Sequence, residues 1–259
     1  MKLNSRGLAL KIILPFVLLA SPIISRADDP KEDNSKVMPV AVPVKIARSY
    51  KLDELVHYDV TMKLNIAGAE ILIVTGNKIT AKETKKDGSV VVLEEPELMK
   101  ITSGGVTQKA PGNKPWKEVR DNRGILKDYI VDDDPAAVTS PNGLRLVASM
   151  SDVLLPEKEV KSGESWETEI DNPTRTNKKY KIKSTLLGIE KIDGVDYLKI
   201  DQMAEAAFEI ESSKMSYHLI AWVDPANGQM FKIHGVLKGL PTQSGSIGWD
   251  MSMQRTKPK

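Results

Sequence analysis

Two of the three histidines in the chain could meet across a predicted hairpin. One register of that hairpin would place His218 opposite His234 on a single face. Zinc sites use at least three protein ligands, so Glu209 or Glu211 on the neighbouring strand would have to supply another. Polar faces of antiparallel sheets usually contact water. The pattern therefore indicates a weak metal-binding pair at most, and two solvated histidines are the simpler interpretation.

Other patterns that could carry chemistry are absent or incomplete. The third histidine, His57, lies on the polar face of a predicted strand, where we expect it to be solvated. The acidic run at 132–134 lacks the alternating spacing of a calcium loop and better fits the first turn of a helix. The sequence contains no nucleophile elbow, zinc-protease motif, Walker loop or dinucleotide fingerprint. We therefore expect a protein without a cofactor or a resident metal.

The absence of cysteine narrows the function classes further. With no cysteine in the chain, thiol catalysis and cysteine metal sites are excluded. The carboxylate pair of a glycoside hydrolase is defined by its separation in the folded protein, which the sequence does not reveal. A hydrolase therefore stays open as the least favoured of three hypotheses. The favoured hypothesis is a protein that is not an enzyme.

The first 27 residues have the three parts of a secretory signal peptide. Three cations lie in the first eleven residues, an apolar run covers 12–24, and Ser25 and Ala27 occupy the −3 and −1 positions of a cleavage site. The apolar run is too short for a helix to cross about 30 Å of hydrocarbon. No cysteine follows it for lipid attachment. We expect cleavage after Ala27, an extracytoplasmic (periplasmic or secreted) protein, and no transmembrane anchor after cleavage.

Removal of this segment changes the charge balance. It carries four of the 37 cations and none of the 35 acids, so 33 cations remain and the formal charge becomes −2. The basic patch expected of a nucleic-acid-binding protein is therefore missing, and nucleic acid is not an expected partner. Residues 28–48 are polar and then proline-spaced, which predicts a flexible leader.

The remaining 49–259 region has the pattern of a β-sheet. Between Val56 and Ile66, apolar and polar residues alternate strictly, which predicts a strand with one buried and one solvated face. Similar strands follow in two meanders, 49–135 and 156–259, joined by a partly helical segment with a short helix at 142–154. We expect a mainly β fold: a large curled antiparallel sheet, as a half-barrel or as two meanders, with one or two short helices.

Three segments resemble a pattern in uncharacterised exported bacterial β-sheet proteins. They are LPEKEVKSGESWETE at 155–169, LLGIEKIDGVDYLKI at 186–200 and WVDPANGQMFK at 222–232. These proteins are distantly similar to the curled-sheet lipoprotein-carrier superfamily, whose members pack a helical plug inside the sheet. Only the 142–154 segment could serve as such a plug here. The resemblance implies a fold and supplies no catalytic residues.

The leading hypothesis is an exported protein whose curled sheet binds a lipid, another apolar small molecule or an envelope protein. The candidate ligand-facing residues are Tyr58, Met62, Leu64 and Trp222. The alternative is a structural or interaction module of the cell envelope that holds no ligand. An enclosed apolar cavity inside the sheet would favour the first hypothesis, and a filled core the second.

Overall fold

The structure is a computed structural model that describes residues 34, 36–66, 69–131, 140–209, 212–242 and 245–256. The predicted signal peptide, the acidic run at 132–134 and Glu211 lie outside the described residues. Within those ranges, no helix has both the length and the apolar character needed to cross a membrane.

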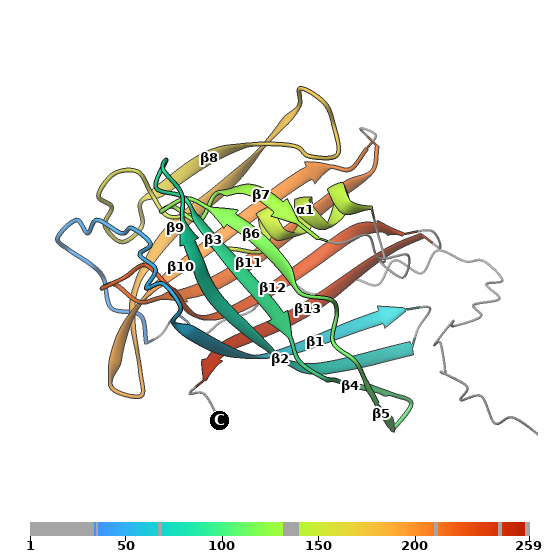
Figure 1. Cartoon of the computed structure of the whole chain (residues 1–259). Helices are drawn as coiled ribbons and strands as arrows, with labels where there is room; N and C mark the ends of the chain where they lie inside the picture. Colours follow the sequence, from blue (N-terminus) through green and yellow to red (C-terminus); the bar gives the residue numbers. More distant parts are fainter. Residues whose placement is uncertain are drawn as a thin grey trace, which may run out of the picture.

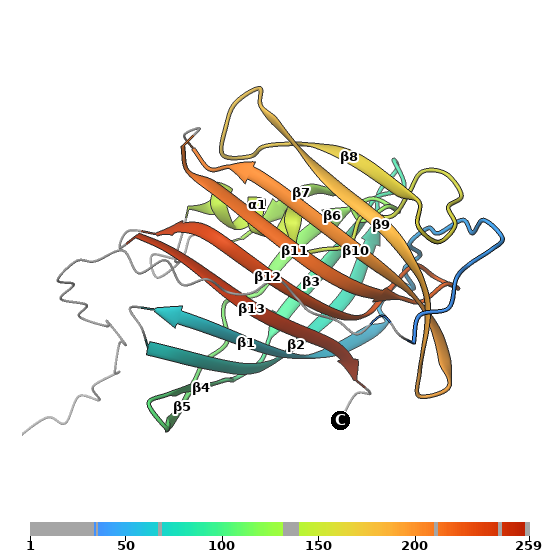
Figure 2. The same cartoon turned by 180° about the vertical axis from the view of Figure 1, so that it is seen from behind.

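Thirteen antiparallel strands form one curled sheet (Figures 1 and 2). Eleven follow the order β7-β6-β3-β2-β1-β13-β12-β11-β10-β9-β8, while β4 pairs with β2 and β5 pairs with β4. The sheet does not close into a barrel, and the mainly β, curled antiparallel architecture is confirmed. The strands are β1 Leu55–Ile66, β2 Ala69–Thr84, β3 Val90–Pro96, β4 Met99–Ser103, β5 Val106–Ala110, β6 Trp116–Arg120, β7 Leu126–Ile130, β8 Ser165–Asp171, β9 Lys179–Ile192, β10 Val195–Ala207, β11 Lys214–Val223, β12 Met230–Thr242 and β13 Gly245–Thr256.

The two meanders meet where the first strand of the sheet pairs with the last. In β1, Met62 lies opposite Met251 of β13 and Leu64 lies opposite Trp249. On its other side, β1 pairs with β2 along its whole length. The alternating pattern of β1 therefore places its apolar residues on the concave face, because a slip of one residue would exchange the two faces. The meander limits inferred from the sequence remain a prediction.

One helix, α1 (Pro141–Met150), packs inside the curl, where Figure 1 shows it between β6–β7 and the strands of the second meander. Ser140 caps its first turn by accepting a hydrogen bond from the Gly143 N–H, and a proline occupies its first position. Leu146 and Met150 are fully buried against the concave face of β9–β12. The expected internal helix is thus present, four residues shorter than expected at its C-terminal end.

The segment after α1 is fixed to the sheet by a buried amide. Gln202 of β10 accepts a hydrogen bond from the Leu154 N–H at 2.8 Å and donates one to the Asp152 carbonyl at 2.8 Å. Leu154 and its neighbours Val153 and Leu155 are almost completely buried. Together, α1 and residues 152–155 seal the concave side of β8–β12.

Part of the expected leader lies against the sheet. Met38 pairs with Ile189 and Val44 with Val160 in isolated antiparallel bridges. Ile46 is 2% exposed within the main core. The apolar residues of this proline-spaced segment thus pack against the rest of the domain. The sequence alone does not indicate where they would pack.

Several strand details differ from the sequence-based expectation. In the β11–β12 hairpin, His218 lies opposite Val236 and His234 lies opposite Ile220, so the two imidazoles do not face each other. The pairing is displaced by two residues from the expected register, and the register shift next to Trp222 supplies one of them. Strands β4, β5 and β6 have no clear signal in the sequence. These three are only five residues long, too short to establish a pattern of alternation.

The turn of this hairpin generates a test of local geometry. Gly228 has φ +65°, and a Cβ atom added there would lie 2.5 Å from the carbonyl oxygen of Ala47. We expect Gly228→Val to lower the free energy of unfolding by about 2 kcal/mol or more, through backbone strain and overlap. Ala226→Ser, at an exposed position of the same turn, should change it by less than about 0.5 kcal/mol. Urea denaturation of both variants measures the difference, and equal midpoints would contradict the assigned turn.

Candidate ligand-binding surface

Cross-strand pairing aligns the inward side chains in three rows that run across the concave face. The first row comprises Ala204, Tyr217, Leu237, Trp249, Leu64 and Ile71. The second comprises Gln202, Leu219, Gly235, Met251, Met62 and Ile73. The third comprises Ile200, Ala221, Ile233, Met253, Val60 and Thr75. Each row therefore crosses from the second meander into the first.

Burial changes along each row. On β10–β12 the row members are almost fully buried under α1 and residues 152–155. On β13, β1 and β2 the apolar members are only half-buried, and they form the surface that we call the apolar strip. The apolar strip comprises Val60, Met62, Leu64, Ile71, Ile73, Trp249, Met251 and Met253. It is continuous with the core but is not sealed by the helix.

Three of the four predicted ligand-facing residues lie on the concave face. Met62 and Leu64 belong to the apolar strip. Tyr58 follows on the same face, is 4% exposed, and donates its hydroxyl hydrogen bond to the Met230 carbonyl at 2.7 Å. Its hydroxyl is therefore engaged within the protein, and Tyr58 borders the apolar strip rather than belonging to it.

Trp222 does not join them, because it lies on the convex face. It is 1% exposed, and its indole Nε1 donates to Glu190 Oε2 at 3.0 Å. The ammonium groups of Lys199 and Lys232 lie 5.0 and 4.3 Å from its ring centre. These contacts make Trp222 the centre of a cation–π and ion-pair cluster on the opposite side of the sheet from the apolar strip.

The histidines are paired with acids rather than with each other. His218 Nε2 lies 2.7 Å from Asp201 and His234 Nε2 lies 3.0 Å from Asp250. Across the described part of the chain, no group of three or more His, Cys, Asp or Glu side chains is placed to hold a metal ion. Glu209 is exposed on the loop after β10. The geometry offers no support for a shared metal.

The expectation of a solvated His57 is wrong. This side chain is buried on the convex face, with Nδ1 2.8 Å from Thr256 Oγ1 and Nε2 3.1 Å from Glu97 Oε2. The close approach requires a glycine on β2, because a Cβ atom at Gly76 would overlap the Glu97 carboxylate. Lys78 completes the group with an ion pair to Glu97 at 2.9 Å.

A buried charge cluster lies at the end of the concave face beyond Tyr58. Asp152 accepts from Arg48 at 2.5 Å and lies 3.1 Å from Arg120, which also pairs with Glu118 at 2.6 Å. Burial alone would raise the pKa of Asp152, but Arg48 and Arg120 hold that pKa below its usual range. Two cations and two carboxylates therefore balance within this cluster.

A third acidic group, Glu94, lies beside this cluster and retains its proton at neutral pH. Burial and the neighbouring Glu118 carboxylate together raise the pKa of Glu94 to about 8. Part of the Glu94 residue reaches solvent, but protein surrounds its carboxyl group, which accepts from Asn77 Nδ2 at 2.8 Å. Two neighbouring carboxyl groups, one of them protonated, resemble a general-acid arrangement, but here both are held by partners within the protein, Glu94 by Asn77 and Glu118 by Arg120.

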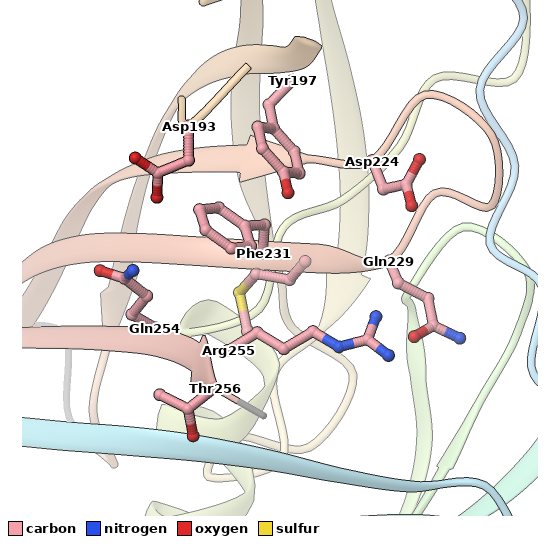
Figure 3. Close-up of a pocket in the computed structure, with 9 residues that line it drawn as sticks. Asp193, Tyr197, Asp224, Gln229, Phe231, Gln254, Arg255 and Thr256 are labelled. Carbon is pink, nitrogen blue, oxygen red and sulfur yellow. The ribbon is translucent and has the colours of Figure 1, made fainter. Parts of the chain in front are cut away.

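A separate open hollow of about 350 Å³ lies beside the β9–β10 and β11–β12 turns (Figure 3). Tyr197 and Phe231 are stacked at its centre, with ring centres 4.2 Å apart. Arg255 on its rim lies 3.3 Å from Glu54. The aromatic faces are largely used by each other, and the lining mixes both charge signs without an arrangement of catalytic groups.

Comparisons with known proteins give likenesses of fold only. No family model and no curated protein matches the chain. A lipovitellin structure described in terms of lipid–protein interactions matches over 82% of this chain at 7% identity, with a TM-score of 0.44. The chain spans only 26% of that lipovitellin chain.

Two bacterial structures match over most of both chains. The hypothetical lipoprotein YmcC of Escherichia coli K12 is 15% identical over 78% of this chain and 86% of its own, with a TM-score of 0.29. A DUF1329 family protein from Desulfovibrio piger is 9% identical over 79% and 85%, with a TM-score of 0.23. These likenesses are consistent with the weak fold-level resemblance that the sequence indicates, and they carry no conclusion about activity.

The charge cluster makes a prediction about stability. Asp152→Asn removes the carboxylate shared by Arg48 and Arg120, so we expect the free energy of unfolding at pH 7 to fall by about 3–5 kcal/mol. The exposed pair Lys181–Glu167, 3.1 Å apart, provides the control, and Glu167→Gln should cost less than about 1 kcal/mol. Because the pKa of Asp152 is lowered, its contribution is present above about pH 4 and is lost as the pH falls further. Urea denaturation at pH 7 and below about pH 4 tests this. Similar losses in free energy of unfolding for the two variants at pH 7 would disprove it.

Glu94 makes a prediction of opposite sign. The unfolded chain loses this proton near pH 4.5, whereas the folded protein keeps it to about pH 8, so stability falls as pH rises between these values. Glu94→Gln should remove this slope, which amounts to at most about 2.7 kcal/mol between about pH 5.5 and 7.5. Glu95→Gln, on the opposite face of β3, should leave the slope as in the unaltered protein. Denaturant titrations at the two pH values that show equal slopes for all three proteins would contradict the environment assigned to Glu94.

Proposed function

We propose that the protein is exported, is not an enzyme, and binds an apolar ligand such as a lipid acyl chain along the apolar strip. The observation that carries this proposal is the half-exposure of eight apolar side chains on the inner side of a curled sheet. Contiguous exposed apolar surface on a soluble domain commonly marks a binding site. A ligand that covers this surface would gain roughly 25 cal/mol for each Å² removed from water.

The concave geometry favours a small flexible ligand over a flat protein partner. The apolar strip lies within the curl and shares its rows with the buried core below α1. Its methionines, Met62, Met251 and Met253, are unbranched and adapt to ligands of different shape. The proposed signal peptide at 1–27 and leader at 28–48 would deliver the 49–259 domain to the envelope, where acyl lipids are available.

Native mass spectrometry of protein purified from the cell envelope of its own host tests this proposal. We expect a chain that begins at Asp28 and carries a co-purifying lipid. Met62→Asp should abolish the adduct, because an ionised carboxylate on the apolar strip opposes burial of an acyl chain. Since Met62 is half-buried, the variant should still fold.

The matched control is Thr61→Asp, one residue away on the convex face, which should retain the adduct and the thermal stability. A ligand-free mass for the unaltered protein would favour the interaction module instead. An intact Met1 on membrane-embedded protein would contradict export and release.

A further inference from the structure

Two hydrogen-bond donors without partners border the apolar strip. The hydroxyl Oη of Tyr217 and the indole Nε1 of Trp249 are both buried, and neither has a hydrogen-bond partner among the described residues. Tyr217 as a whole is 2% exposed. Buried polar atoms are nearly always hydrogen-bonded in native proteins, so two such donors on one face indicate that a partner is supplied from elsewhere.

The sheet register places Tyr217 and Trp249 on either side of the same residue. Tyr217 and Trp249 both lie opposite Leu237, one on each side of β12, so their Cα atoms are about 10 Å apart. The Tyr217 ring leans over β12 toward the next row. A Cβ atom on Gly235 would fall 2.3 Å from Oη, and the φ of Gly235 is not positive, so a glycine is required there for space alone. Oη therefore lies above β12, beside the row that contains Met251.

The chemistry of the donors selects the ligand group. An indole N–H can only donate, and burial raises the pKa of Tyr217, so its hydroxyl also keeps a proton to donate. The ligand must then offer acceptor oxygens. The three rows contain no lysine, arginine, aspartate or glutamate. A carboxylate buried there would lack a counter-charge, whereas a neutral carbonyl would not need one.

We propose that Tyr217 and Trp249 hydrogen-bond the ester group of a neutral fatty acyl ester whose chain lies along the apolar strip. This inference rests on the proposed function and adds the class of ligand head that the site accepts. In the first row, Tyr217 lies in the sealed part and Trp249 in the half-buried part, with Leu237 between them. An acyl ester placed there would satisfy both donors and cover the neighbouring apolar side chains.

The test compares three probes of similar length: methyl laurate, tridecane and laurate. Dialysis with labelled probes should show that the unaltered protein binds methyl laurate more tightly than either of the others. Tyr217→Phe should weaken the binding of methyl laurate roughly five- to tenfold, the effect of one neutral hydrogen bond, and leave the binding of tridecane unchanged. Trp249→Phe should weaken the binding of methyl laurate more than that of tridecane, because it removes the indole donor as well as part of the apolar strip. The melting temperature of ligand-free Tyr217→Phe should be equal or higher, because the deleted hydroxyl has no partner to lose.

Tyr180→Phe is the matched control, because the Tyr180 hydroxyl is buried but lies 2.6 Å from Ser149 Oγ. This variant should lower the melting temperature and leave the preference for the ester intact. A loss of stability in Tyr217→Phe, or equal weakening of ester and hydrocarbon, would overturn the inference. Tighter binding of laurate than of its ester would overturn the choice of a neutral head. If the unaltered protein binds the ester and the hydrocarbon equally, only this inference fails; if it binds none of the probes, the proposed function fails with it.

Discussion

The carboxylate of Asp152 is the contact on which the arrangement of the concave face depends. It joins Arg48 from the N-terminal segment and Arg120 from β6 to the chain that leaves α1. The free energy needed to remove these charges from water largely offsets their mutual attraction. The cluster therefore contributes specificity more than net stability. Three segments distant in sequence thus meet at one place. With Gln202 binding the same chain from β10, the helix and residues 152–155 are fixed over one half of the sheet.

The other half of the concave face remains uncovered because α1 is much smaller than the sheet. A ten-residue helix is about 15 Å long and about 10 Å wide, whereas eleven strands placed side by side extend over about 50 Å before curling. One such helix cannot cover the whole concave face. The sheet follows an alternating apolar pattern along β1 and β13 as it does in the first half of β11, residues 214–219, so the uncovered strands still present apolar side chains inward. The apolar strip results from this mismatch between one short cover and a wide sheet.

Alternation in the sequence was enough to predict which face of β1 turns inward, because register on a one-sided sheet follows the apolar positions. The same reasoning did not place Trp222, whose neighbours on β11 are apolar on both faces, so no alternation distinguishes inside from outside there. Nor could it find the burial of His57, which depends on Glu97 approaching across Gly76. The contact between Tyr217 and Gly235 is likewise spatial. Residues that meet only through strand pairing leave no local signal in the chain.

Several departures from a fully satisfied structure lie on the concave face. The convex face is neutralised by matched pairs such as Lys199 with Glu190 and Lys78 with Glu97. The concave face instead holds half-exposed apolar side chains, the unpartnered donors of Tyr217 and Trp249, and a protonated Glu94. Each of these features lowers stability by itself, and chains that fold well remove such conflicts unless a function retains them. A ligand of the proposed kind would cover the half-exposed apolar side chains and supply a partner to the two donors.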